Sequence, residues 1–150
     1  MTASMPRRPR LHTARYANKI LATHPAAKVG ITLGPPRFRL SYQLAGKILE
    51  LAPTREMFRK GEAEFAAAYT ALLVERGGVE HLHHRFASVA AEAGTDALVL
   101  ACFEDLRTPG LWCHRRVFAE WWEMHTGEVV AELDEAPTST LNPSTGCPGC

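Results

Sequence analysis

Apolar residues in this chain form short continuous runs and longer stretches with helical spacing, and residues 96–133 hold the clearest example of both. Ala97–Cys102 is an apolar run with the length and composition of a strand buried on both faces. A Thr-Pro-Gly break follows, and from near Trp112 apolar residues recur on one helical face until Gly127. Val129–Leu133 then predicts a second strand. The segment therefore predicts a β-loop-α-β unit.

The same patterns predict two strands and two helices upstream. The strands are Leu11–Ala17, which is weakly patterned, and Lys28–Leu33, which is rich in β-branched residues. The helices are Glu62–Arg76 and Val79–Ala93, each with one apolar stripe and glycine after its end. This alternation of strands and helices predicts an α/β fold: a single domain in which helices flank a small, mainly parallel, Rossmann-like sheet.

Residues 49–58 predict a turn and a short helix before the first long helix. Leu49–Pro53 is the turn, and Thr54 is the candidate N-cap of the helix that follows. We expect Met57 and Phe58 to point toward the core.

Length and composition fit one domain, since 150 residues with 46% apolar content can build a single core. We expect residues 1–10 to be a disordered basic arm, 11–134 the α/β domain, and 135–150 a disordered tail ending in Cys-Pro-Gly-Cys. We find neither an export signal nor a run of about 20 apolar residues, so we expect a cytoplasmic protein with no membrane partner. The four cysteines are then expected to be thiols.

Charge is distributed unevenly along the chain. Residues 1–60 carry twelve Lys and Arg against two Glu, which is +10, whereas residues 61–150 carry five against fourteen Asp and Glu, which is −9. Such asymmetry is typical of a half that binds a polyanion. The alternative is that basic and acidic faces neutralise each other across the fold, and the net charge of +1 favours that interpretation.

Candidate chemistry gathers where the strand before the Thr-Pro-Gly break ends and the following helix begins. Open parallel sheets place their ligands at this carboxyl edge. Cys113 in the first helical turn would lie near unpaired backbone N–H groups and the positive end of the helix dipole, which lower the pKa of a thiol. His114 and Arg115 add a proton-transfer group and a phosphate contact. A thiolate nucleophile and an anion site are both open interpretations for this turn.

Two residues at the end of the strand complete the candidate site. Cys102 and Glu104 project to the same side if the strand continues that far. Glu104 is either a general acid/base or the partner of an arginine, and Cys102 is either part of the site or a small buried core residue. Another candidate ligand contact, Arg37, lies with Phe38 in an extended basic and aromatic segment that suits a nucleotide or a nucleic-acid strand. The alternative for this segment is a surface loop whose aromatic side chains fold back onto the core.

We assign no metal site and no cofactor from the sequence. Cys102, Cys113 and His114 could contribute to a zinc site only with a fourth ligand, and the Cys147/Cys150 pair lies beyond a segment rich in Pro, Ser and Thr. His81 and His84 share a helical face but have no further ligand at a matching helical spacing, which indicates solvated or hydrogen-bonded histidines.

The strand ending in Cys-x-Glu at Cys102 and Glu104, followed by a helix that opens with Cys113-His114-Arg115, resembles the bacterial and phage family known as domain of unknown function 488. The likeness extends to Ile-Thr-Leu-Gly-Pro-Pro-Arg and Leu-Glu-Leu-Ala-Pro upstream, and it spans residues 15–134. It implies an α/β fold with a mainly parallel sheet and polar residues at its edge, to which it adds Tyr16 and Arg37. Residues 105–111 lack the lysine that the family often has there, and the Cys-Pro-Gly-Cys ending matches no part of its pattern.

These observations lead us to expect a protein that binds a phosphate-bearing ligand at the Cys113 helix terminus. The ligand would be a nucleotide, a nucleoside derivative or a nucleic-acid end, and a transferase or hydrolase using Cys113, His114 and Glu104 is one version. One alternative is a non-catalytic nucleic-acid-associated module that uses the basic first sixty residues. Another is a structural or partner-binding protein. Since Trp121 and Trp122 do not both fit easily in one core, one of them would lie at the interface of a homodimer.

Overall fold

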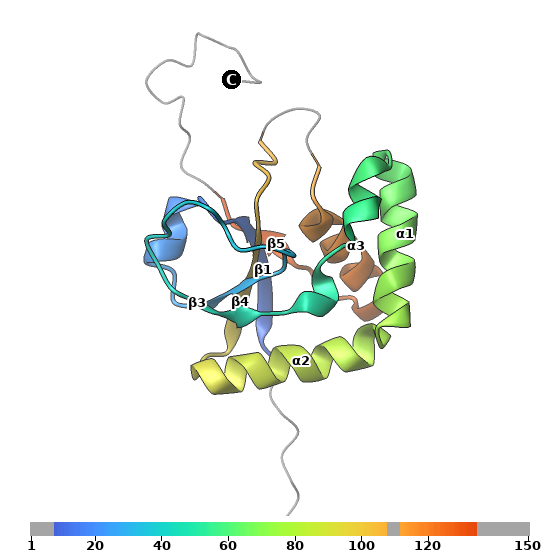
Figure 1. Ribbon diagram of the computed structural model, residues 1–150. Coiled ribbons are helices and arrows are strands. Elements are labelled where there is room, and N and C mark those ends of the chain that lie inside the picture. The colour runs from blue at the N-terminus through green and yellow to red at the C-terminus, as the bar shows by residue number, and fades with distance from the viewer. Residues whose placement is uncertain (1–7, 108–111, 135–150) are drawn as a thin grey trace, which may run out of the picture.

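Five parallel strands form the centre of the fold in the computed structural model, which describes residues 8–107 and 112–134 (Figure 1). The order across the sheet is β3-β2-β4-β1-β5, and each neighbouring pair is parallel. The strands are β1 (Arg10–Arg15), β2 (Ala27–Gly30), β3 (Leu44–Lys47), β4 (Ala97–Cys102) and β5 (Ala131–Glu132). The α/β fold with a parallel sheet, which the sequence predicts, is confirmed.

Three α-helices and two 3-10 helices pack on one face of the sheet, and one 3-10 helix packs on the other (Figure 1). The α-helices are α1 (Glu62–Glu75), α2 (Gly78–Ala93) and α3 (His114–Thr126). The 3-10 helices are η1 (Lys19–Ala22), η2 (Leu49–Leu51) and η3 (Arg55–Arg59). Leu21 of η1 packs with Ala14 and Val99 on the face opposite the α-helices. In the described part of the chain, no helix has the length and apolar character needed to cross a membrane.

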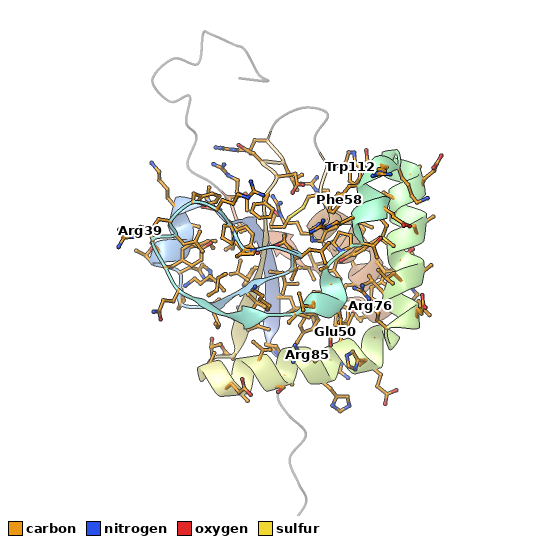
Figure 2. All side chains as sticks on the ribbon, viewed as in Figure 1. Arg39, Glu50, Phe58, Arg76, Arg85 and Trp112 are labelled. Atoms are coloured by element: carbon orange, nitrogen blue, oxygen red, sulfur yellow. A yellow bond between two sulfur atoms is a disulfide. The ribbon has the colours of Figure 1, made fainter. Side chains whose placement is uncertain are left out.

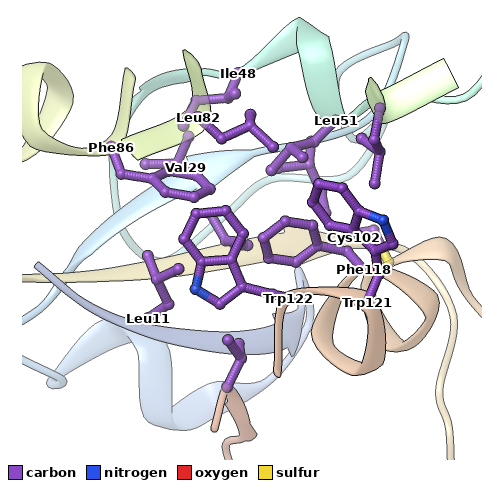
Figure 3. Close-up of a cluster of buried hydrophobic side chains, with 14 of the residues drawn as sticks. Leu11, Val29, Ile48, Leu51, Leu82, Phe86, Cys102, Phe118, Trp121 and Trp122 are labelled. Atoms are coloured by element: carbon purple, nitrogen blue, oxygen red, sulfur yellow. The ribbon is translucent and has the colours of Figure 1, made fainter. Parts of the chain in front are cut away.

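The main core lies between the sheet and the three α-helices (Figure 3). Phe118 and Trp122 of α3 contact Phe86 of α2, with ring centroids 6.0 and 5.3 Å from the Phe86 ring. Trp121 is 6% exposed and Trp122 is fully buried, so both tryptophans fit in one core. Our expectation that they do not was wrong: Trp122 points toward the sheet and α2, while Trp121 packs against His125 on its own helix, 4.9 Å between rings.

Observed elements agree with the predicted ones within a few residues, except that β3 and η1 were not predicted. The four residues of β3 are Leu-Ala-Gly-Lys and lack an apolar run. Met57 is buried as expected, but Phe58 is 51% exposed at the amino end of α1, near Trp112 (Figure 2). Residues 1–7 of the predicted arm and the predicted tail at 135–150 lie outside the described residues, whereas Arg10, which we had assigned to the arm, begins β1.

The connections out of two neighbouring strands, β2 and β4, lead away from each other across the sheet. The chain leaves β2 toward β3 on one side, and it leaves β4 toward β5 on the other side. In an open parallel sheet, the crevice beyond the carboxyl ends of two such neighbouring strands is the usual place for a ligand. The carboxyl ends of β2 and β4 are at Gly30 and Cys102, and Gly30 is in register with Ala101. The topology therefore places the predicted site residues at this switch point.

Candidate functional site

Two buried cysteines join the end of β4 to the beginning of α3. Cys102 is the last residue of β4 and Cys113 is the N-cap of α3, and their side chains are 0% and 1% exposed. Their Sγ atoms are bonded as a disulfide, and their Cα atoms are 7.7 Å apart. We had expected thiols, so this pairing corrects the sequence-based interpretation of these two residues.

The imidazole of His114 is held in a single tautomer beside Cys113. Its Nε2 donates a hydrogen bond of 2.8 Å to the carbonyl oxygen of Ile31, just beyond β2. A carbonyl oxygen can only accept, so the proton lies on Nε2 and the lone pair on Nδ1. Nδ1 is 3.6 Å from Sγ of Cys113. The ring is also packed edge-on against Tyr69 of α1, at 5.7 Å between centroids.

Burial keeps this imidazole neutral at ordinary pH. His114 is 2% exposed, and desolvation lowers its pKa to about 4, with the nearby charge of Arg115 acting in the same direction and the hydrogen bond to Ile31 opposing both. A neutral ring with its lone pair on Nδ1 can accept a proton from a thiol or donate an electron pair to a metal ion.

Arg115 is fully buried and its guanidinium has three partners. Its Nε and Nη2 donate to the two carboxylate oxygens of Glu132 in β5, at 2.9 and 2.7 Å. Its Nη1 lies 2.9 Å from Sγ of Cys102. Glu132 also accepts a hydrogen bond of 2.8 Å from the hydroxyl of Thr13 in β1. Because this two-point ion pair occupies the guanidinium, Arg115 positions the cluster and does not present a free phosphate contact.

Glu104 approaches the sulfur of Cys102 from the loop after β4. One of its carboxylate oxygens is 3.7 Å from Sγ of Cys102, and the residue is partly exposed. The two side chains do meet, but β4 ends at Cys102, so strand alternation, on which the sequence-based prediction depended, does not bring them together. The next acidic residue, Asp105, is paired with Arg107 and Arg15; the hydrogen bond from Arg107 is the largest influence lowering its pKa to about 2.

Tyr16 lies at the carboxyl edge, while Arg37 does not join the cluster. The Tyr16 hydroxyl is 2.8 Å from Oγ1 of Thr32, which in turn donates to the carbonyl oxygen of Gly34, so Tyr16 is the donor to Thr32. Burial is the largest influence on the Tyr16 hydroxyl, raising its pKa. Arg37 is exposed in the segment between β2 and β3, and within the described residues no hydrogen bond links it to the cysteines or to His114.

A small cavity lies beside the Arg115–Glu132 pair. Its volume is about 340 Å³, and it is lined by residues from the loop after β4, from α3 and from the end of β5: Leu106, Arg107, Arg116, Glu132, Leu133 and Asp134. Arg116, unlike its neighbour Arg115, is exposed. The three residues expected to face a ligand directly, Cys113, His114 and Arg115, are buried and do not line this cavity.

Several residues of the site were not identified from the sequence. Glu132 was predicted only as part of a strand, and a carboxylate in a short strand after a Cys-His-Arg turn is the sequence signal for its ion pair. Ile31 contributes through its backbone carbonyl, which no side-chain pattern reveals. Tyr69 belongs to the apolar stripe of α1, which the sequence predicts to face the core. Its ring contact with His114 depends on how α1 and α3 pack against each other.

No protein-family model, curated protein or solved structure matches the chain. The resemblance to the family known as domain of unknown function 488 therefore stays a prediction. The fold and the cluster define a single α/β domain with a buried cysteine-histidine centre at the switch point of its sheet.

Proposed function

We propose that this protein binds a phosphate-bearing ligand at the carboxyl edge of its sheet, with Cys102, Cys113 and His114, here called the Cys-His cluster, as its functional centre. One observation supports the proposal above the others: cysteine and histidine side chains from separate chain segments meet where the connections of β2 and β4 lead apart. This is the position that ligands prefer in open parallel sheets. A cluster of this composition is more than packing requires, because aliphatic residues would fill the same volume without buried polar atoms.

The cavity beside the cluster is the proposed place for the ligand. It adjoins the amino-terminal turn of α3, whose unpaired N–H groups and dipole favour an anion. Arg116 is the proposed phosphate contact, because it is exposed and lines this cavity. Glu132 and Asp134 also line this cavity and suit the hydroxyl groups of a sugar or nucleoside.

The experiment compares phosphorylated ligands with their dephosphorylated counterparts. Binding of nucleoside monophosphates, nucleoside triphosphates and the matching nucleosides is measured by isothermal titration calorimetry. We expect binding that requires the phosphate and that weakens about tenfold or more in Arg116→Gln, since a charged hydrogen bond contributes about 1.5–3 kcal/mol. Arg10→Gln is the matched control, because Arg10 is exposed at the opposite, amino end of β1. Equal binding with and without phosphate, or equal losses in both variants, would contradict the proposal.

A nucleic-acid end is a second candidate for the ligand, and one surface observation favours it. Phe38 is 46% exposed between the exposed Arg37 and Arg39, and Arg39 projects outward from the molecule (Figure 2). Tyr42 instead turns inward, where its hydroxyl donates to the carbonyl oxygen of Tyr16 at 2.8 Å. One exposed ring between two cations is the arrangement that stacks on a base.

The oligonucleotide test separates this candidate from the first. A 5′-phosphorylated oligonucleotide should bind more weakly in Phe38→Ala and lose affinity steeply as salt rises. Binding that survives Cys113→Ser but not Phe38→Ala would assign the role to this surface instead of the Cys-His cluster. Affinity that is independent of salt would exclude the nucleic-acid candidate.

A further inference from the structure

We propose that the Cys-His cluster is a metal site once a thiol reductant has transferred two electrons to the Cys102–Cys113 disulfide and opened it: Sγ of Cys102, Sγ of Cys113 and Nδ1 of His114 then bind one zinc-like divalent ion. This inference rests on the proposed function, because it names the cofactor of the same functional centre. The three donor atoms lie within 4.8 Å of one another, and all three residues are buried. Two thiolates and one imidazole are a donor set that zinc takes in proteins, with water or substrate in the fourth position.

The distance between the cysteine and histidine donors of α3 matches a tetrahedral ion. Zinc bonds of about 2.3 Å to sulfur and about 2.0–2.1 Å to nitrogen place those two donors about 3.6 Å apart at the tetrahedral angle. Sγ of Cys113 and Nδ1 of His114 are 3.6 Å apart. The corresponding edge between a sulfur and a carboxylate oxygen is about 3.5 Å, and Cys102 and Glu104 are separated by 3.7 Å.

The orientation of His114 is that of a metal ligand. Histidines that bind metal ions through one nitrogen usually donate the other N–H to a carboxylate or to a backbone carbonyl, which fixes the ring and the tautomer. Nε2 of His114 makes this bond with Ile31, so the Nδ1 lone pair is directed at the cysteines. No rotation of the ring is needed for it to reach an ion there.

The backbone spacing also leaves room for an ion between the two sulfurs. The Cα atoms of Cys102 and Cys113 are 7.7 Å apart, whereas disulfides usually join Cα atoms separated by about 4.4–6.8 Å. Around zinc the two sulfurs would be about 3.8 Å apart, and such a bridge spans a longer distance than a direct bond. The reduced, metal-bound form therefore fits this backbone.

Charge at the cluster favours a divalent cation. Two thiolates carry two negative charges, and burial of such charges requires compensation. The nearby guanidinium of Arg115 is already neutralised by its two-point pair with Glu132. An ion with charge +2 balances the thiolates, and the 2.9 Å contact from Arg115 to Sγ of Cys102 then supports a ligating sulfur.

Glu104 is the residue that we assign to the fourth position, because its carboxylate lies 3.7 Å from Sγ of Cys102. It was the missing element in our sequence-based rejection of a metal site, which considered a ligand from the Cys147/Cys150 pair. A partly exposed carboxylate can bind the ion directly or accept a proton from a bound water molecule. Cys113 is then a metal ligand and not a free nucleophile.

The test is the metal content of the full chain purified with reductant and without chelator. Inductively coupled plasma mass spectrometry should find about one zinc ion per chain, and native mass spectrometry should show the same mass increment. The double variant Cys147→Ser/Cys150→Ser is the decisive control, because it removes the other cysteine pair. We expect this control to keep its zinc, while Cys102→Ser and His114→Gln each lose at least nine-tenths of it. His84→Gln, at an exposed histidine of α2, should match wild type.

Cobalt substitution tests the donor set independently of folding. Co²⁺ bound by two thiolates shows a sulfur-to-metal charge-transfer band, which should weaken in Cys113→Ser, while Glu104→Gln should shift only the visible d–d bands. Circular dichroism of every variant shows whether a loss of metal comes from unfolding. If Cys113→Ser does not fold, the cobalt spectrum of Glu104→Gln, which keeps both cysteines, still shows whether the thiolate band is present. Zinc lost with the Cys147/Cys150 pair, no zinc in reduced wild type, or a spectrum without thiolate bands would each overturn the inference. If zinc is absent and phosphate-dependent binding still requires Arg116, the inference fails and the proposed function stands.

Discussion

Replacing Glu132 by Gln should destabilise the protein more than an ordinary surface change does. The substitution keeps the size of the side chain but removes the negative charge that pairs with the fully buried guanidinium of Arg115. Breaking a buried ion pair by neutralising one partner costs about 3–5 kcal/mol, because the other charge remains buried without compensation. The Glu132 side chain is 29% exposed, so water can partly replace the carboxylate, and we expect a loss near about 3 kcal/mol.

Urea denaturation followed by tryptophan fluorescence measures this loss, because Trp122 is fully buried in the native state. Glu120→Gln is the matched control: Glu120 is exposed on α3, and its replacement should change the free energy of unfolding by less than about 0.5 kcal/mol. The double variant Arg115→Met/Glu132→Met should recover most of the loss, since it leaves no unpaired charge. A loss below about 1 kcal/mol in Glu132→Gln would be that of a surface pair and would refute the reasoning.

Three further predictions follow from other contacts. Gly30→Ala should cost about 1–3 kcal/mol, because a Cβ there would lie 2.7 Å from the Tyr16 hydroxyl oxygen, and Tyr16→Phe should relieve much of that cost in unfolding experiments. Phe118→Ala should lower the free energy of unfolding by about 3–5 kcal/mol, since it opens a cavity in the main core. Glu50→Gln should lower stability at pH 6 but much less at pH 3, as measured by urea denaturation at each pH.

The sign of the pH prediction follows from the environment of Glu50. Burial alone would raise its pKa, but hydrogen bonds from His81 and Arg85, at 2.6 and 2.9 Å, outweigh burial and lower the pKa below the usual 4.5 (Figure 2). A carboxyl group with a lowered pKa in the folded state adds stability above the unfolded value, and that stability is lost as pH falls through the folded pKa. A difference between wild type and Glu50→Gln that grows toward pH 3 would contradict this sign.

Elements with a clear pattern of apolar residues, either a continuous run or a helical stripe, were predictable from the sequence. Ala97–Cys102 is a continuous apolar run, and β4 has those bounds, because a strand covered on both faces buries every side chain. The bounds of α1 and α2 followed from one apolar stripe and terminal glycines. The strand β3 could not be predicted in the same way, since Leu44–Lys47 is at an edge of the sheet and only half covered.

The residues that form the site were more predictable from the sequence than the orientation of their side chains. The sequence placed Cys102, Cys113, His114 and Arg115 together because strand ends and helix starts share one edge in a β-loop-α-β unit. It did not reveal that their side chains turn inward. That outcome depends on partners distant in sequence, the carbonyl of Ile31 and the carboxylate of Glu132, which become neighbours only when the sheet assembles. Burial of a charged residue such as Arg115 is therefore a tertiary property.

The guanidinium of Arg115 connects a sulfur atom to the outermost strand of the sheet. It contacts Sγ of Cys102 on one side and Glu132 on the other, and β5 has only the two residues Ala131 and Glu132 to pair with β1. So short a strand depends heavily on side-chain contacts for its attachment. A change in the electron density on Sγ of Cys102, whether by oxidation, protonation or coordination, would change the strength of its contact with Arg115. The attachment of β5 to the sheet would change with it. Hydrogen exchange at the Leu133 amide, which donates to the carbonyl oxygen of Thr13, would therefore report the chemical state of Cys102 through the guanidinium of Arg115.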